Sequence, residues 1–265
     1  MICQSPVKSQ NHQLVKLWET DTLLKVPESV RFDPARKILY TANIDGQPWE
    51  KDGQGSIGKV GLDGKIIVSE WVTGLNAPKG MGIHAGRLYV ADVDEVVVID
   101  LTKGQVAQRL PIEGAEGLND LTIDKKGVIY VSDSKTKKIH RIKKGKVGVA
   151  VDNVQGPNGV LMVGADLYLT NSGGLYKLEK TGSLTKIADG MEGGTDGIEY
   201  VGNGDFLVSC WAGTIWYVSA NGNKELLLDT REQKINAADI GYDPINKIVY
   251  VPTFWKNSVA AYRLQ

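Results

Sequence analysis

Leu39-Tyr40-Thr41-Ala42-Asn43 is the stretch that decides the fold, because five similar stretches follow it along the chain. The five are Leu88–Asp92, Ile129–Asp133, Leu167–Asn171, Asp205–Ser209 and Val249–Thr253. The aromatic residues in the six copies, at positions 40, 89, 130, 168, 206 and 250, are spaced by 49, 41, 38, 38 and 44 residues. Alternating segments rich in Val, Ile and Tyr predict β-strands, and this spacing is close to the length of a four-stranded propeller blade.

The two ends of the chain complement each other. The last copy ends at Gln265 after only three strands, while an unassigned strand at residues 13–18 precedes the first copy. We expect residues 13–18 to supply the missing outer strand, because this closes the ring and leaves no open sheet edge. The sequence therefore predicts an all-β protein, a six-bladed β-propeller over residues 13–265 behind a disordered or flexible tail of residues 1–12. The six copies and the complementary ends favour this fold over an open β-solenoid or a sandwich.

Composition limits the possible partners. The chain has 31 Lys plus Arg and 31 Asp plus Glu, so it has no global field to attract nucleic acid or an anionic membrane. No apolar stretch approaches the roughly 18 residues that cross a bilayer. We expect a monomer that binds a small molecule, with no nucleic-acid partner and no membrane span.

The two cysteines, Cys3 and Cys210, have no metal-ligand spacing and say little about redox compartment. A polar tail that begins near Cys3 is compatible with a trimmed lipoprotein signal, and an ordinary disordered terminus is the alternative. On this basis a periplasmic or extracytoplasmic location is slightly favoured over a cytoplasmic one.

Six residues share one register position at the start of the innermost strands. When these strands are aligned by the apolar residue before each turn, the equivalent residues are Glu28, Lys79, Asn119, Asn158, Asp196 and Ala238. The fold places this set in one ring around the axis. Four members are oxygen donors without sulfur or imidazole, which is the ligand type of a hard cation such as calcium or magnesium. Lys79 either extends to solvent or binds an anionic group of a substrate.

Aromatic residues lie in the loops that follow the second strands. Trp49, Trp211 and Trp255, with Phe254, are expected on the same side as the ring, where they would form a small-ligand pocket. The alternative for each tryptophan is packing between neighbouring blades. The longest of these loops, residues 45–55, is the best candidate for a lid.

One motif is set aside. Residues 53–59 match the glycine and lysine spacing of a phosphate-binding loop, but Val60 stands where that loop needs Ser or Thr. A strand is also expected to follow, whereas the loop needs the amino terminus of a helix. We therefore expect no nucleotide cofactor. With three histidines and no nucleophile elbow, a serine–histidine triad is disfavoured as well.

The chain resembles the senescence marker protein (regucalcin) and gluconolactonase-like family over about residues 20–265. The motifs that carry the resemblance are Pro27–Pro34, Leu118–Asp124, Pro157–Val160 and Thr195–Glu199. The resemblance implies one divalent metal at the channel mouth, with Glu28, Asn158 and Asp196 as ligands. It also implies that Asn119 contacts a metal water or the substrate and that Asp196 is the base. Family members act on lactones, and some hydrolyse organophosphates.

Two positions differ from the family pattern. Sugar-lactone enzymes of the family tend to carry an arginine two residues before the Asn-Asp motif, where this chain has Gly117, so the resemblance does not extend to a sugar-binding clamp. The motif itself continues with Leu121 in place of the more usual glycine.

The leading hypothesis is a metal-dependent hydrolase of a lactone or related ester, with Asp196 and Asn119 in catalytic roles. Asn119, Lys79, Trp49, Trp211 and Trp255 would contact the substrate. Calcium is the expected cofactor, and Mg2+, Mn2+ and Zn2+ are alternatives. The rival hypothesis is a non-catalytic propeller that binds metal and a small ligand, or a protein partner. An open pocket above the metal position would favour the enzyme.

Overall fold

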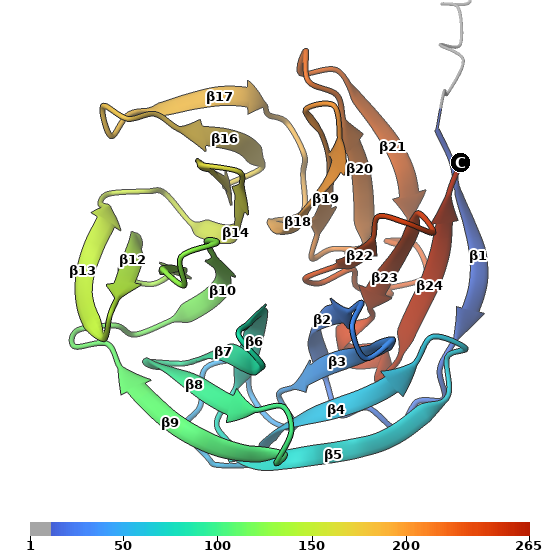
Figure 1. The fold of residues 1–265 in the computed structure, drawn as a ribbon. Helices are drawn as coiled ribbons and strands as arrows, with labels where there is room; N and C mark the ends of the chain where they lie inside the picture. Colours follow the sequence, from blue (N-terminus) through green and yellow to red (C-terminus); the bar gives the residue numbers. More distant parts are fainter. Residues whose placement is uncertain (1–11) are drawn as a thin grey trace, which may run out of the picture.

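The structure, a computed structural model, describes residues 12–265 and consists of six antiparallel sheets around a central channel (Figure 1). Each sheet has four strands, and in five sheets the strand order from the axis outward follows the chain. The protein is therefore a six-bladed β-propeller, as predicted. Within residues 12–265 no helix is long and apolar enough to cross a membrane.

The strands fall into four classes by their distance from the axis. The innermost strands are β2 (Pro27–Asp33), β6 (Pro78–His84), β10 (Leu118–Ile123), β14 (Pro157–Val163), β18 (Thr195–Gly202) and β22 (Gly241–Asp243). The second strands are β3 (Ile38–Asn43), β7 (Arg87–Asp92), β11 (Ile129–Asp133), β15 (Asp166–Asn171), β19 (Asp205–Cys210) and β23 (Ile248–Pro252). The third strands are β4 (Gly55–Gly61), β8 (Glu95–Asp100), β12 (Lys138–Lys143), β16 (Gly174–Leu178), β20 (Thr214–Val218) and β24 (Val259–Leu264). The outer strands are β5 (Ile66–Leu75), β9 (Gln105–Pro111), β13 (Lys146–Val151), β17 (Leu184–Ala188), β21 (Lys224–Asp229) and β1 (Leu14–Glu19).

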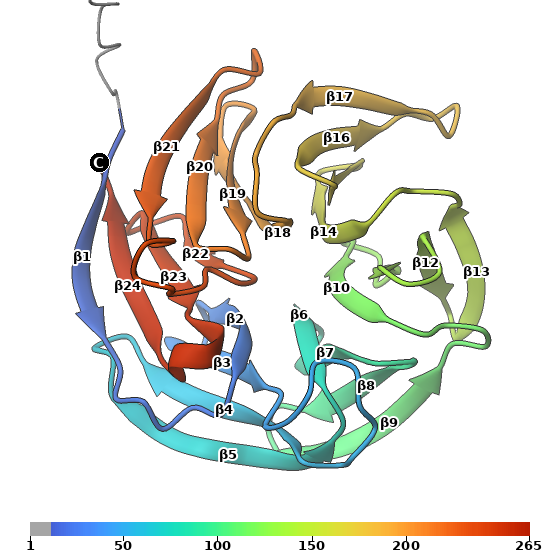
Figure 2. The same cartoon turned by 180° about the vertical axis from the view of Figure 1, so that it is seen from behind.

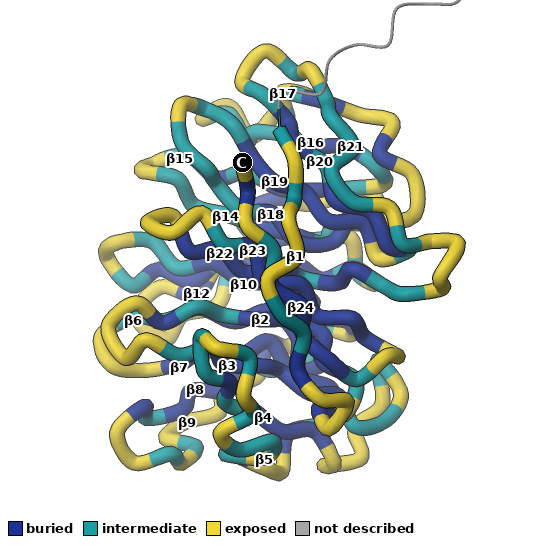
Figure 3. The backbone as a smooth tube through the Cα atoms, turned by 90° about the vertical axis from the view of Figure 1, so that its right-hand side faces the viewer, coloured by how far each residue is buried: buried dark blue, intermediate teal, exposed yellow. Residues whose placement is uncertain are grey.

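The N-terminal strand closes the last blade, as predicted. β1 pairs antiparallel with β24, from Leu14 opposite Leu264 to Glu19 opposite Ala260, and Figure 3 shows the two strands side by side. Trp18 also ties this blade to the first one, because its indole Nε1 donates a hydrogen bond to the Leu62 carbonyl at 3.0 Å. Apart from His12, the tail predicted for residues 1–12 lies outside the described residues, as does Cys3.

The core lies between neighbouring blades. One cluster joins Tyr40 and Ile57 of the first blade to Met81, Leu88 and Val97 of the second, and all five are at most 3 % exposed. Burying a side chain of this kind contributes roughly 1.5–3 kcal/mol, so each blade depends on its neighbours for stability. Residues 55–59 of the set-aside glycine and lysine motif lie in strand β4, which leaves no helix amino terminus at that place.

Candidate active site at the channel mouth

Five of the six ring residues line one cavity at the mouth of the channel. The cavity has a volume of about 300 Å³, and its lining includes Glu28, Lys79, Asn119, Asn158 and Asp196. The sixth ring residue, Ala238, is buried and contributes no side chain to it. The view in Figure 2 faces the connection between β3 and β4 and the short 3-10 helix η1 (Phe254–Lys256), which stand at this end of the ring.

The ring holds oxygen atoms that lack partners. Glu28 Oε2, Asn158 Oδ1 and Asp196 Oδ1 are buried, and none accepts a hydrogen bond from any residue between 12 and 265. Leaving a buried polar atom unpaired costs roughly 1–3 kcal/mol, so three such atoms on residues that line one cavity point to a ligand that the protein alone does not supply. Two carboxylates and an amide oxygen suit a hard divalent cation.

The possible cation ligands at the mouth include the side-chain amide of Asn158 as well as carboxylates. In the described part of the chain, no group of three or more His, Cys, Asp or Glu side chains is arranged as a metal site. The residues that could hold a cation are therefore Glu28 and Asp196 together with Asn158. Such a mixed oxygen set favours calcium over zinc, which prefers nitrogen and sulfur ligands.

The charges at the mouth are poorly compensated within the protein. Burial raises the pKa of Glu28, and Lys79 only partly opposes this effect. Burial also raises the pKa of Asp196 well above its usual range, and the nearby Glu28 carboxylate raises it further. Both carboxylates are thus hard to ionise in the absence of a cation, and a bound cation would reverse that effect.

Among residues 12–265, Lys79 is the only cationic side chain in the lining of this cavity. It is 2 % exposed, and its Nζ lies 3.7 Å from Glu28 Oε1 and 4.5 Å from the centre of the Trp49 ring. Burial lowers the pKa of Lys79, while Glu28, Asp196 and Asp92 act in the opposite direction. Lys79 does not extend to solvent, so of the two expectations for it only a role inside the cavity remains.

Aromatic side chains form the apolar wall. Trp49, Trp211 and Phe254 line the cavity, whereas Trp255 does not. Trp255 is 49 % exposed and packs edge-on against Phe254, with ring centroids 4.8 Å apart. Phe254 has a left-handed φ of 51°, which is rare for a bulky residue, and its ring also meets Trp211 edge-on at 5.6 Å.

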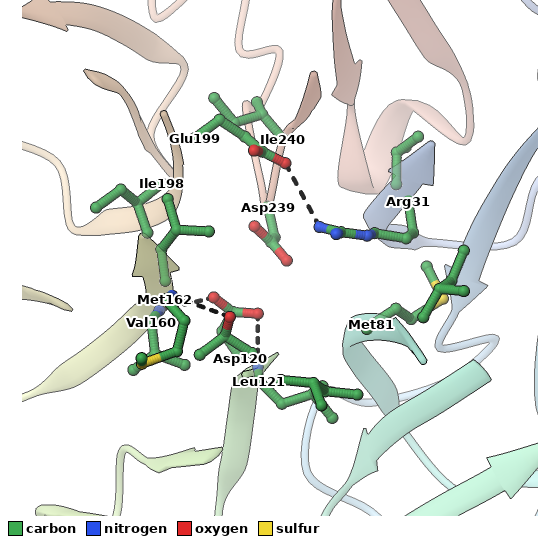
Figure 4. A pocket seen from close by; sticks show the side chains of 16 residues that line it. Arg31, Met81, Asp120, Leu121, Val160, Met162, Ile198, Glu199, Asp239 and Ile240 are labelled. Atoms are coloured by element: carbon green, nitrogen blue, oxygen red, sulfur yellow. Dashed lines mark hydrogen bonds and ion pairs between the residues drawn. The ribbon is translucent and has the colours of Figure 1, made fainter. Parts of the chain in front are cut away.

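A second group of charged residues lies deeper in the channel and was missed in the sequence. Asp120, Glu199 and Asp239 point into a small cavity of about 110 Å³ that Arg31 also lines (Figure 4). Arg31 Nη1 lies 3.7 Å from Glu199 Oε1. Burial raises the pKa of Asp120 and of Glu199 to about 7, and burial followed by repulsion from Asp120 raises the pKa of Asp239.

The register used for the ring would have found this group. Asp120 and Asp239 each stand one residue after a ring position, and Arg31 and Glu199 each stand three residues after one. Glycines at the same register let the inner strands approach closely. A Cβ atom at Gly80 would collide with Asp120 Oδ1, and one at Gly197 would collide with Asp239 Oδ1. The small residues of these strands are thus explained by close packing at the axis.

No family model and no curated protein matches the sequence. Solved structures do resemble the fold. A gluconolactonase from Xanthomonas campestris has a TM-score of 0.72 at 16 % identity, covering 95 % of this chain and 89 % of that one. A candidate gluconolactonase solved by structural genomics has a TM-score of 0.72 at 12 % identity, covering 96 % and 93 %.

The chain has the fold of a gluconolactonase-like propeller. Lyases share this architecture too. Virginiamycin B lyase from Staphylococcus aureus has a TM-score of 0.65 at 13 % identity, covering 95 % of this chain and 98 % of that one. At such identities the likeness concerns the fold, and any activity has to be inferred from the residues at the mouth.

Proposed function

We propose that the protein is a hydrolase of a lactone or related ester that uses a divalent cation, most suitably calcium, at the mouth of the propeller channel. The observation that carries this proposal is that three buried oxygens without partners, from Glu28, Asn158 and Asp196, belong to residues that line one open cavity of about 300 Å³. The cavity is large enough for a small ester, and its aromatic wall suits the apolar part of such a substrate.

The cation, when bound, would polarise the ester carbonyl and stabilise the charge that develops on its oxygen. The protein side chains supply the proton transfers. Asp196 takes a proton from an attacking water, the water oxygen bonds to the carbonyl carbon, and the carbon–oxygen bond of the ester breaks. Asp196 then returns the proton to the leaving alkoxide, so that water and ester become acid and alcohol.

Asn119 has the position and the chemistry of an orienting group. Its Nδ2 donates a hydrogen bond to Ser134 Oγ at 3.1 Å, which fixes the amide plane, and its side chain lines the cavity. Ser134 Oγ in turn donates to the Pro157 carbonyl at 2.7 Å, next to Asn158. This chain of hydrogen bonds couples the orientation of Asn119 to the strand that carries Asn158.

The test is a panel of lactones and esters, assayed after chelation and again with Ca2+, Mg2+, Mn2+ or Zn2+ added. Two variants separate the roles of Asp196. Asp196→Asn keeps an oxygen donor without the base, so we expect cation binding with turnover reduced by roughly 100-fold or more. Asp196→Ala should lose both. An Asp196→Asn variant with full turnover would contradict the role of base.

Because lyases share this fold, the same experiment also has to distinguish hydrolysis from elimination. Hydrolysis in water enriched in oxygen-18 places one labelled oxygen in the product, whereas elimination places none. Mass spectrometry of the product therefore distinguishes the two reactions. Ring opening without label would overturn hydrolysis. Cation binding without turnover on any substrate would favour the non-catalytic alternative.

A further inference from the structure

Lys79 is a buried cation, and its nearest carboxylate, that of Glu28, is also a ligand of the proposed cation site. The side chain is 2 % exposed, and its Nζ is 3.7 Å from Glu28 Oε1. A buried ammonium is costly unless it is paired and hydrogen-bonded. Yet the other oxygen of Glu28, Oε2, is buried without a partner and belongs to the proposed cation site.

Among the side chains that line this cavity, the charges do not balance once a divalent cation is present. Glu28 and Asp196 supply two negative charges, and the cation supplies two positive ones. Lys79 then leaves one positive charge in excess. The other acid that acts on Lys79 is Asp92, which accepts hydrogen bonds from the Asn76 and Ala77 backbone N–H groups and lies 4.0 Å from Arg109. Asp92 therefore already has partners of its own and is not a dedicated counter-ion for Lys79.

The excess charge faces the place where a substrate would lie. Lys79 lines the cavity together with Trp49, whose ring centre is 4.5 Å from Lys79 Nζ. A second ammonium, that of the exposed Lys135, lies 5.2 Å from the same ring. Lys135 reaches this position across Gly117, where a Cβ atom would lie 2.7 Å from Lys135 Cγ. One inner and one outer cation therefore flank a single indole at the entrance.

We propose that the site selects a substrate bearing one carboxylate close to its ester group, and that Lys79 is the residue that pairs with this carboxylate. The carboxylate neutralises the excess charge of the cation-loaded mouth, and the Lys135 ammonium draws it in from the rim. A neutral lactone leaves Lys79 buried without a counter-ion of its own. The reaction class of this substrate rests on the proposed function, whereas the anion subsite rests on Lys79 and on the cation proposed for the mouth, and does not require turnover.

The experiment compares two ligands that differ only in charge, a five-membered lactone with a ring carboxylate and the same lactone with a carboxamide. Binding to the calcium-loaded full-length protein is followed by tryptophan fluorescence, and turnover is measured separately. We expect the carboxylate to bind at least roughly 10-fold more tightly than the carboxamide. Lys79→Met keeps the length and the apolar stem without the charge, and should reduce this preference to about 1.

Lys177→Met is the matched control, because it removes a lysine that pairs with Asp166 at 2.9 Å on another blade, away from the lining of the cavity. It should keep the full preference. Thermal unfolding shows whether Lys79→Met folds, and if it does not, the preference of the wild type decides alone. Equal binding of the two ligands by the wild type, or an undiminished preference in folded Lys79→Met, overturns the proposal.

The same data separate this proposal from the proposed function. Tight, Lys79-dependent binding of the carboxylate without turnover would keep the anion subsite and reject the hydrolase. Hydrolysis of both lactones at equal kcat/KM and equal affinity would keep the hydrolase and reject the anion subsite.

Discussion

Replacing Glu199 with Gln removes a titrating group from the channel and preserves its shape. Burial raises the pKa of Glu199 from 4.5 to about 7, and Arg31, 3.7 Å away, only partly offsets this effect. Between these pH values the folded protein holds a proton that the unfolded chain has released. The contribution of Glu199 to stability is therefore present below pH 4.5 and is lost as the pH rises through 7.

The size of the loss follows from the shift. One pKa unit corresponds to about 1.4 kcal/mol, so Glu199 should cost the wild type roughly 2–3 kcal/mol of unfolding free energy between pH 5 and pH 8. The Gln side chain does not titrate, so Glu199→Gln escapes this loss. Relative to the wild type, the variant should therefore gain roughly 2–3 kcal/mol between the two pH values.

Urea unfolding at pH 5 and pH 8, with a chelator present, measures this difference. Glu113→Gln is the control, because Glu113 is exposed on a loop. The unfolding free energy of this variant relative to the wild type should be the same at both pH values. If the difference in unfolding free energy between Glu199→Gln and the wild type does not change with pH, the raised pKa of Glu199 is refuted. A relative loss at pH 8 would mean that the ion pair with Arg31 outweighs burial.

Three further predictions concern the ring, the set-aside motif and the cation. Deleting residues 1–19 removes the five β1 positions that pair with β24 and should lower the unfolding free energy by roughly 4 kcal/mol. A truncated protein that melts like the full chain would disprove closure of the ring by β1. Calorimetry with ATP or GTP and Mg2+ should detect no binding, because the motif before Val60 leads into a strand, and micromolar binding abolished by Lys59→Ala would be the contrary result. Calcium at about 100 times its dissociation constant should raise the Tm by roughly 5–10 °C, and Asn158→Ala should abolish this rise; an equal rise in that variant would place the cation elsewhere.

The sequence was sufficient for the fold because the blade repeat is strong. The aromatic residue of each copy marks a second strand, from Tyr40 in β3 to Tyr250 in β23, and alternation places it in the packing between blades. Counting strands at the two ends then identified the closing strand. The last inner strand was harder to place, because β22 is reduced to Gly241–Asp243 and the ring residue Ala238 precedes it.

At the channel mouth, the position of a side chain could be predicted only where strand register determines the direction in which it points. Except for Ala238, the ring residues lie at the start of regular strands, so Lys79 and Asn119 lie where the alignment put them. Loop residues do not follow such a rule. The left-handed backbone of Phe254 turns its ring into the cavity wall, whereas Trp255 lies outside the lining. The distances that matter most, such as that between Lys79 and Glu28, arise from the packing of different blades and have no signal in a single sequence.

Ring closure by β1 also sets the order of events during synthesis. Leu14 pairs with Leu264, so β1 waits for a partner that is made 250 positions later. At about 5–20 residues per second, this wait lasts roughly 12–50 seconds. During this time the sixth sheet is incomplete, and the first blade lacks the neighbour that this sheet provides. The nascent chain therefore stays exposed to aggregation and proteolysis until β24 is available to pair with β1.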